Sequence, residues 1–310
     1  MTHPAPRRSQ DVRTRYTELI NALQAEGDHD AARRCAALAV EQGVWRHPAQ
    51  RPVHYLPSIP PRPVYDPSAF WFTAHLQENH AAIRAELDAV TDPAGQGFLP
   101  VEEPLLGKGR WEQVTFYEAG HRFDDACARF PVTAAVIEGI PEAAHAGSGV
   151  ATLSWLYPGT HIVPHCGGTN ARLRVHLGLK VPEGPVMRVG EEWLHWEEGR
   201  CLVFDDSFEH EVRHEGTEPR VVLLLDVTHP ALDEHTRDAI LADRASFEER
   251  VVGFMRRQGI GRVEIDDDAV RLFADRSTAS LIHRHLREVG ASAVELRDGR
   301  LCYDEKILHT

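Results

Sequence analysis

The chain has 310 residues, of which 42% are hydrophobic and 26% are charged, a composition typical of a soluble globular protein. This length suits one large domain with additions, or two modest domains. The formal net charge of −13 argues against a broad nucleic-acid-binding surface, although an acidic protein can still contain a locally basic pocket.

The five cysteines are odd in number, lie far apart and form no CxxC pair. They therefore predict neither a disulfide framework nor a structural zinc site. The basic N-terminal residues precede no apolar signal segment, and no run of 18 apolar residues predicts a membrane span. We expect a cytoplasmic protein with no membrane and no nucleic-acid partner, of unknown oligomeric state.

Residues 1–47 are expected to form an N-terminal helical pair, because apolar stripes mark two amphipathic helices between residues 10 and 42. Such a pair resembles a single tetratricopeptide-like unit, but no second copy follows, so we expect it to pack against the main domain. Residues 48–67 contain seven prolines and predict an extended connector, since each proline fixes its φ angle and lacks an amide donor.

Residues 68–232 are expected to form the main domain with its leading helices. One helix should begin at Asp66-Pro67-Ser68 and run to about Val90, and a second should span Asp125 to Glu138. Short segments of strand length follow, separated by Gly, Pro, Asp or Asn. They are VTFYEAG, ATLSWLYPG, RLRVHLGLKVP, VMRVGEEWLHW, GRCLVFDD, HEVRHEG and RVVLLLDVTHP. So many closely spaced strands predict a mainly β fold with flanking helices, either a sandwich or a jelly roll.

Residues 233–310 are expected to form a C-terminal helix over 233–257 and a small α+β appendage. The appendage should contain a strand at Arg262–Ile265, a helix at Asp268–Val289 and a hairpin, VELRDGRLCY. The Asp298-Gly299 pair in this hairpin suits a type I′ turn. No motif in this region indicates chemistry.

Two histidines on predicted strands are candidate metal ligands, since imidazole suits iron, copper, zinc or nickel. His165 is followed by Cys-Gly-Gly, so the backbone there can approach a bound group closely. His210 alternates with Phe208 and Val212 on an apolar face. Each histidine alone is more typical of a loop or core residue, but the gap between them fits the second and seventh strands of a jelly roll. A facial iron triad would place an acidic residue at Gly167.

Arg172, Arg174 and His176 alternate along one strand and therefore share a face. A solvent-exposed polar face is the ordinary explanation, but three such side chains repel one another unless an anion lies among them. Arginine suits this role because its planar fork matches a carboxylate. Arg220 and Ser154, on neighbouring predicted strands, are candidates to meet the same anion, although an arginine where a loop enters a strand is ordinarily a surface residue and most serines are structural.

The motifs YPGTHIVPHCGGTNARLRVHLGLKVP, WEEGRCLVFDDSFEHEV and RVVLLLDVTHP make residues from about 70 to 232 resemble the aspartyl/asparaginyl β-hydroxylase family. This family comprises Fe(II)- and 2-oxoglutarate-dependent dioxygenases. The resemblance covers roughly half of the chain and implies a double-stranded β-helix, or jelly-roll, core. It also implies Fe(II) as cofactor, with 2-oxoglutarate and O2 as cosubstrates.

The resemblance implies that His165 and His210 are the catalytic metal ligands, with no acidic ligand at the position of Gly167. It further implies that Arg220 and Ser154 hold the distal carboxylate of 2-oxoglutarate. A dicarboxylate needs compensating groups at both ends, because burying an unpaired carboxylate is costly.

For the other end of the cosubstrate, the resemblance implies contacts from Arg174 and His176, and it assigns Arg172 to the carboxylate of the substrate. The implied reaction hydroxylates the β-carbon of an Asp, Asn or related side chain and releases succinate and CO2. The substrate is expected to be a small-molecule, carrier-tethered or peptide amino acid. Thr152 replaces a substrate-binding lysine of some members, so the sequence leaves the identity of the substrate open.

Other functions remain compatible with the same residues. The glycine at position 167 leaves room for chloride at iron, which would suit a radical halogenase or another oxidative 2-oxoglutarate enzyme of natural-product biosynthesis. A non-catalytic binding protein with the dioxygenase fold is a further alternative, against which the retention of His165, His210 and Arg220 argues. Product mass and succinate formation distinguish the three.

Overall fold

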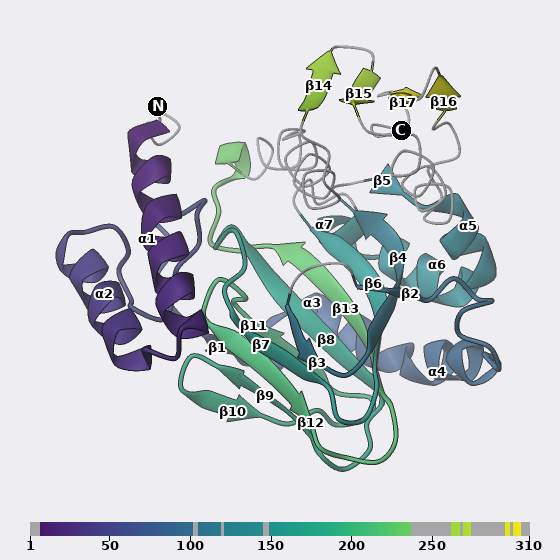
Figure 1. The fold of residues 1–310 in the computed structure, drawn as a ribbon. Helices are drawn as coiled ribbons and strands as arrows, with labels where there is room; N and C mark the ends of the chain where they lie inside the picture. Colours follow the sequence, from purple (N-terminus) through teal and green to yellow (C-terminus); the bar gives the residue numbers. More distant parts are fainter. Residues whose placement is uncertain are drawn as a thin grey trace.

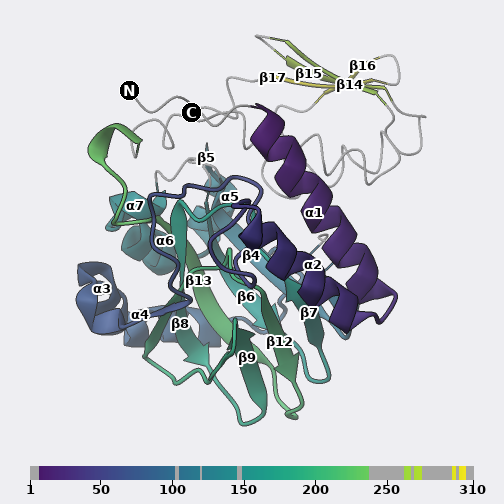
Figure 2. The same cartoon turned by 90° about the vertical axis from the view of Figure 1, so that its left-hand side faces the viewer.

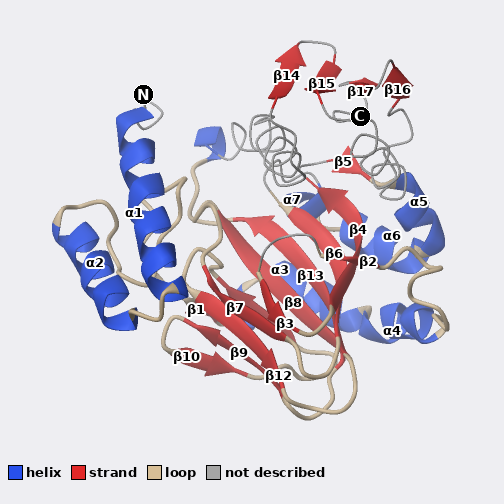
Figure 3. Ribbon diagram, in the orientation of Figure 1, coloured by secondary structure: helices blue, strands red, loops and turns tan. Residues whose placement is uncertain are grey.

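The computed structural model describes residues 7–101, 105–118, 121–144 and 149–236, together with four short strands between residues 262 and 304. Two antiparallel sheets lie face to face, helices cover the outer side of the larger sheet, and a helical pair lies to one side (Figures 1 and 3). The fold is mainly β with flanking helices, as the sequence predicted. In the described part of the chain, no helix combines the length and the apolar character needed to cross a membrane.

The larger sheet has the strand order β1-β11-β8-β13-β6-β4-β2, with β5 paired to β4. Its strands are β1 (Val64–Tyr65), β2 (Leu99–Pro100), β4 (Trp111–Glu118), β5 (His121–Arg122), β6 (Val150–Leu156), β8 (Arg172–Lys180), β11 (Cys201–Phe204) and β13 (Arg220–Thr228). The smaller sheet has the order β10-β9-β12-β7-β3. Its strands are β3 (Leu106–Lys108), β7 (His161–His165), β9 (Pro185–Val189), β10 (Glu192–Leu194) and β12 (His210–His214).

The eight strands from β6 to β13 form a jelly roll. The strands β11-β8-β13-β6 of the larger sheet face β10-β9-β12-β7 of the smaller one, and the chain moves back and forth between the two sheets. Counted within this set, β7 is the second strand and β12 the seventh, and the two are neighbours. The predicted double-stranded β-helix is therefore confirmed.

Alternation along β13 separates two hydrophobic cores. Val221, Leu223 and Leu225 pack in the core beneath the helices, whereas Val222 and Leu224 pack in the core between the two sheets. Every residue of β13 is buried, so both of its faces are covered. The polar side chains on its inner face therefore lie between the sheets, away from bulk water.

Two helices that the sequence predicted as continuous are interrupted. The first is divided into a short 3-10 helix η1 (Pro67–Ala69), α3 (Trp71–Glu78) and α4 (His80–Asp88), and the second into α5 (Asp124–Arg129) and α6 (Pro131–Glu138), followed by α7 (Pro141–Ala144). Asn79 ends α3 by donating its side-chain amide to the His75 carbonyl at 2.9 Å. Pro131 begins α6 because its ring cannot supply the amide that would continue α5.

The predicted N-terminal helices are confirmed as α1 (Arg7–Ala25) and α2 (His29–Glu41), which lie in front of the sheets in the view of Figure 2. They share a small core that includes Ile20 and Trp45. Two leucines of the apolar stripes from which these helices were predicted are exposed: Leu19 is 51% exposed and Leu38 is 45% exposed. A pair of helices with so few large buried side chains depends on the rest of the protein for stability.

The C-terminal strands are β14 (Arg262–Asp266), β15 (Ala269–Phe273), β16 (Glu295–Arg297) and β17 (Arg300–Asp304), in the order β14-β15-β17-β16. The predicted strand at 262–265 and both arms of the predicted hairpin are confirmed. The helix predicted from residue 268 is wrong for Ala269–Phe273, which pairs with strands on both sides. The remainder of that helix and most of the helix predicted over 233–257 lie outside the described residues.

Candidate active site

The two candidate metal ligands lie side by side on neighbouring strands. His210 on β12 pairs with His165 on β7, and their ring centroids are 4.1 Å apart. The next pair in the register is Val212 with Ile162, so β7 contains one more residue than β12 over this stretch. This bulge turns β7 locally and brings the imidazole of His165 next to that of His210.

Both imidazoles are held in the same tautomer by the backbone. Nδ1 of His165 donates to the Val163 carbonyl at 2.8 Å, and Nδ1 of His210 donates to the Phe208 carbonyl at 2.9 Å. Because a carbonyl can only accept, the lone pair of each neutral ring lies on Nε2. Burial and the neighbouring His165 lower the pKa of His210 to about 3, so its ring is neutral at physiological pH. Metal-binding histidines are oriented by such contacts.

The residues fit a metal that takes two imidazoles and completes its shell with other ligands. Among the described residues, no group of three or more His, Cys, Asp or Glu side chains is arranged to hold a metal ion. A Cβ at Gly167 would lie only 2.6 Å from the carboxyl carbon of Asp206. The space next to His165 where a facial triad would have its acid is therefore filled by a carboxylate from the loop after β11.

Arg172 and Arg174 form a compact charge cluster with Asp206 and Asp226. Arg172 contacts Asp206 at 3.2 Å and Asp226 at 3.3 Å, and Arg174 contacts the same residues at 3.1 and 2.8 Å. Burial alone would raise the pKa of Asp206, but the two guanidinium groups outweigh it and lower that pKa. The anions that the clustered cations require are therefore supplied by the protein itself, and the four charges cancel.

Arg220 is a buried cation of a different kind. It is 2% exposed, and within the described residues its guanidinium has no hydrogen bond or ion pair; it lies over the face of Trp196, 4.7 Å from the ring centroid. Burial lowers its pKa to about 9. A desolvated charge without a counter-ion is costly. The site therefore suits a carboxylate ligand.

Ser154 and His176 share this inner face of the larger sheet with Arg220. Ser154 pairs with Val222, two residues from Arg220 on β13, and its Oγ accepts from Trp111 Nε1 at 2.9 Å. The hydroxyl hydrogen of Ser154 thus remains able to donate. Nε2 of His176 is buried and has no hydrogen-bond partner among the residues that the structure describes. The unpartnered donors lie on the larger sheet, and the histidine pair lies on the smaller one.

Sequence reasoning missed the two aspartates of the charge cluster. Asp226 is a single acid in the apolar run VVLLLDV, and it lies an even number of positions from Arg220, which places both on one strand face. This pattern was the available signal, because a charge inside a buried strand requires a partner. Asp206 had no comparable signal, since it lies in a loop whose path only the fold determines.

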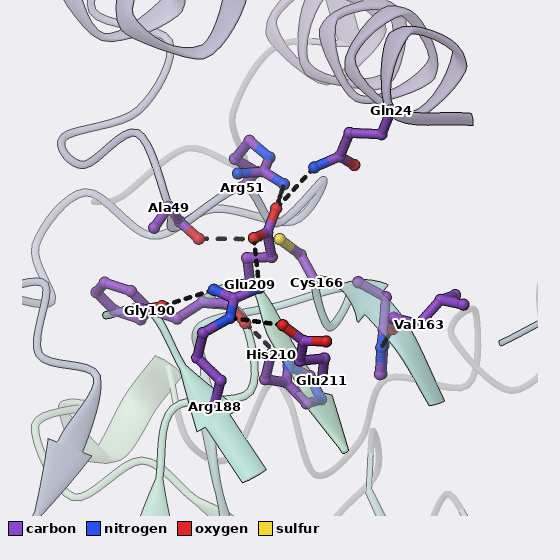
Figure 4. A network of polar contacts seen from close by, with 12 residues as sticks. Gln24, Ala49, Arg51, Val163, Cys166, Arg188, Gly190, Glu209, His210 and Glu211 are labelled. Carbon is purple, nitrogen blue, oxygen red and sulfur yellow. Dashed lines mark hydrogen bonds and ion pairs between the residues drawn. The ribbon is translucent and has the colours of Figure 1, made fainter. Parts of the chain in front are cut away.

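A second polar network lies on the outer side of the smaller sheet and ties the N-terminal region to the strand that carries His210 (Figure 4). Glu209 accepts from Arg51 at 2.7 Å, from Gln24 at 2.9 Å and from Arg188 at 2.9 Å. Its backbone amide also donates to the Ala49 carbonyl at 2.6 Å. These contacts fix the residue immediately before His210.

Comparisons with known proteins identify the relatives of this chain. Residues 77–230 match the family model described as aspartyl/asparaginyl beta-hydroxylase. The chain is 37% identical over 231 residues to the human aspartyl/asparaginyl beta-hydroxylase, a match that covers 73% of this chain and 30% of the human protein. It is 38% identical over 199 residues to mouse aspartate beta-hydroxylase domain-containing protein 1, covering 62% of this chain and 55% of that protein.

The match therefore spans about a third to about half of the length of these relatives. Among solved structures, a prolyl-4-hydroxylase from Pseudomonas putida is 14% identical with a TM-score of 0.34, covering 51% of this chain and 99% of that chain. The structural likeness is low, and the assignment depends on the sequence matches. On this basis the chain belongs to the aspartyl/asparaginyl β-hydroxylase family.

Proposed function

We propose that this protein is an Fe(II)- and 2-oxoglutarate-dependent dioxygenase that hydroxylates the β-carbon of an Asp, Asn or related amino-acid side chain. Family membership supports a hydroxylase. The observation that carries the finer proposal is one arrangement: two imidazoles with their lone pairs on Nε2, together with a buried arginine that has no counter-ion in the described part of the chain. The first suits a metal and the second suits a carboxylate ligand.

In this proposal His165 and His210 hold Fe(II) through Nε2, and their backbone hydrogen bonds keep both rings oriented before the metal binds. Arg220 and Ser154 hold the distal carboxylate of 2-oxoglutarate, and His176 and Arg174 contact its oxo-acid end. When bound together, Fe(II) and 2-oxoglutarate activate O2, releasing succinate and CO2 and transferring one oxygen atom to a C–H bond of the substrate.

The cluster of Arg172, Arg174, Asp206 and Asp226 holds the two arginines in position for their ligands. Arg172 and Arg174 are each held by two carboxylates, so their guanidinium planes are fixed before any ligand arrives. Arg172 is proposed to meet the substrate carboxylate with donors on this fixed plane. Because Asp206 and Asp226 already balance the charge of both arginines, this contact would select the substrate by geometry more than by net attraction.

The halogenase alternative requires an anion beside iron where a triad acid would lie. The carboxylate of Asp206 fills the space beside Gly167, and a second anion there would be repelled. Oxygen transfer is therefore favoured over chloride transfer. A non-catalytic binding protein would have no requirement for two histidines held in one metal-binding tautomer.

The test is succinate formation by the purified protein with Fe(II), ascorbate, 2-oxoglutarate and a panel of Asp- and Asn-containing peptides and free amino acids. We expect succinate only when both iron and 2-oxoglutarate are present, with a substrate mass increase of one oxygen atom. His210→Ala should abolish turnover. A chlorinated product would favour the halogenase, and the absence of succinate across the panel would favour the binding protein.

A further inference from the structure

One indole contacts two of the three donors on the inner face of the larger sheet, His176 and Arg220. Trp196 follows β10 and is 4% exposed. Its Nε1 donates to Nδ1 of His176 at 3.2 Å, with the two ring planes only 15° apart. The guanidinium carbon of Arg220 lies over the face of the same indole, 4.7 Å from its centroid. Trp196 thus donates a hydrogen bond to His176 through its N–H and makes a cation–π contact with Arg220 through its ring face.

This hydrogen bond determines the tautomer of His176. An indole N–H can only donate, so Nδ1 of His176 must be the acceptor. A ring that accepts at Nδ1 is neutral and carries its hydrogen on Nε2. This Nε2 is buried and has no hydrogen-bond partner within the described ranges. This tautomer is opposite to that of His165 and His210, whose backbone carbonyls place the hydrogen on Nδ1. One site therefore holds two rings prepared to coordinate and one ring prepared to donate.

We propose that Trp196 is a positioning residue that fixes His176 as an Nε2–H donor and holds Arg220 on its face, so that both address the same 2-oxoglutarate molecule. The inference rests on the proposed function for the identity of the ligand. Without the indole N–H, His176 is free to move its hydrogen to Nδ1, and Nε2 would then present a lone pair to an anion. The cation–π contact also stabilises the desolvated guanidinium before the ligand binds.

The test compares Trp196→Phe, which keeps an aromatic face but loses the N–H, with Trp193→Phe as a matched control. Trp193 lies three residues away and is 49% exposed, and Phe removes the same group there. The tautomer of His176 is read by NMR of the metal-free, 15N-histidine-labelled full chain, with His176→Gln used to assign the signal. Binding of 2-oxoglutarate is measured by calorimetry with Mn(II) as a redox-stable metal.

We expect Nε2–H for His176 in the wild type and in Trp193→Phe, and a shift toward Nδ1–H in Trp196→Phe. The dissociation constant for 2-oxoglutarate should rise roughly three- to tenfold in Trp196→Phe, as for the loss of one buried hydrogen bond. The KM for 2-oxoglutarate should rise in parallel, while kcat at saturation changes less.

Two results would overturn the role of Trp196: Nδ1–H at His176 in the wild type, or an unchanged tautomer and affinity in Trp196→Phe. The NMR measurement on the wild type determines the tautomer of His176 even if Trp196→Phe does not fold. A wild type that binds no 2-oxoglutarate with the metal present would overturn the proposed function instead. The NMR measurement needs no 2-oxoglutarate, so it tests the role of Trp196 separately from the proposed function.

Discussion

At the scale of single residues, the inner face of the larger sheet holds more positive than negative charge. Two arginines are balanced by Asp206 and Asp226, whereas Arg220 is buried with no acidic partner among the described residues. Such an arrangement costs stability in the ligand-free protein and is retained where a ligand supplies the missing charge.

Arg220→Met should therefore stabilise the ligand-free protein and impair binding. We expect its free energy of unfolding to rise by about 1–3 kcal/mol, since an unpaired buried charge is replaced by an apolar side chain of similar length. The KM for 2-oxoglutarate should rise by roughly 100-fold or more, as expected when one side of a desolvated pair is lost. Urea unfolding and succinate kinetics measure the two effects. Lower stability together with an unchanged KM would contradict this assignment.

Asp205 leads to a prediction about pH. It is fully buried, it accepts from Gln50 and Ser207, and burial raises its pKa to about 7. Because the folded state holds this proton more tightly than the unfolded state, stability falls as pH rises from about 4 to 7.

Asp205→Asn removes this titration, so the stability of the wild type relative to the variant should fall by on the order of 2–3 kcal/mol between pH 5 and pH 8. Urea unfolding of both proteins at the two pH values measures the difference. A difference that does not change with pH would show that Asp205 titrates normally.

At the scale of elements, the proline-rich connector is more than a link between the helical pair and the jelly roll. The backbone of Arg51 donates to the Ser207 carbonyl and that of His54 to the Gly168 carbonyl, at 3.0 and 2.9 Å. The connector therefore braces the chain on the C-terminal side of His165 and on the N-terminal side of His210. Glu209 adds an ion-pair anchor to the same contact (Figure 4).

Glu209→Gln should weaken this brace. Burial would raise the pKa of Glu209, but Arg51, Gln24 and Arg188 lower it to about 2, so the ionised form is stabilised at neutral pH. We expect the variant to lose about 2–3 kcal/mol of unfolding free energy, because two arginines lose a largely buried partner. Asp30→Asn is the matched control, since its partner Arg33 and Asp30 itself are more than 70% exposed. If urea unfolding shows that Glu209→Gln and Asp30→Asn lower the free energy of unfolding equally, Glu209 does not anchor the connector.

At the scale of the whole molecule, the candidate site is divided between two sheets. The histidine pair comes from β7 and β12 of the smaller sheet, and the donors Ser154, His176 and Arg220 come from the larger one. Ligands that contact both groups would therefore link the sheets, and metal and cosubstrate should favour each other's binding.

Fe(II) and 2-oxoglutarate added together under anaerobic conditions should raise the melting temperature by about 5 °C more than the sum of their separate effects. Iron should also dissociate more slowly when 2-oxoglutarate is present, because the chain itself provides two ligands. Thermal unfolding and iron release to a chelator measure these quantities. Additive shifts, or tighter iron retention without 2-oxoglutarate, would contradict the coupling.

The sequence by itself determined which segments of the main domain form strands, because alternation and turn residues are local signals, but this pattern left a sandwich and a jelly roll open. The jelly-roll class and the convergence of His165 with His210 followed from the resemblance of its motifs to a known family. The sequence did not determine the helix breaks at Asn79 and Pro131, or the strand at Ala269–Phe273, where a side-chain cap, a missing amide and strand pairing decided the outcome.

Only the tertiary structure decided which charges meet. It paired Arg172 and Arg174 with Asp206 and Asp226, buried Arg220 with no acidic partner among the described residues, and placed Trp196 in contact with both Arg220 and His176. The physical reason is that a strand pattern states which face a side chain occupies, whereas its partner across a sheet or from a loop depends on the closure of the whole barrel.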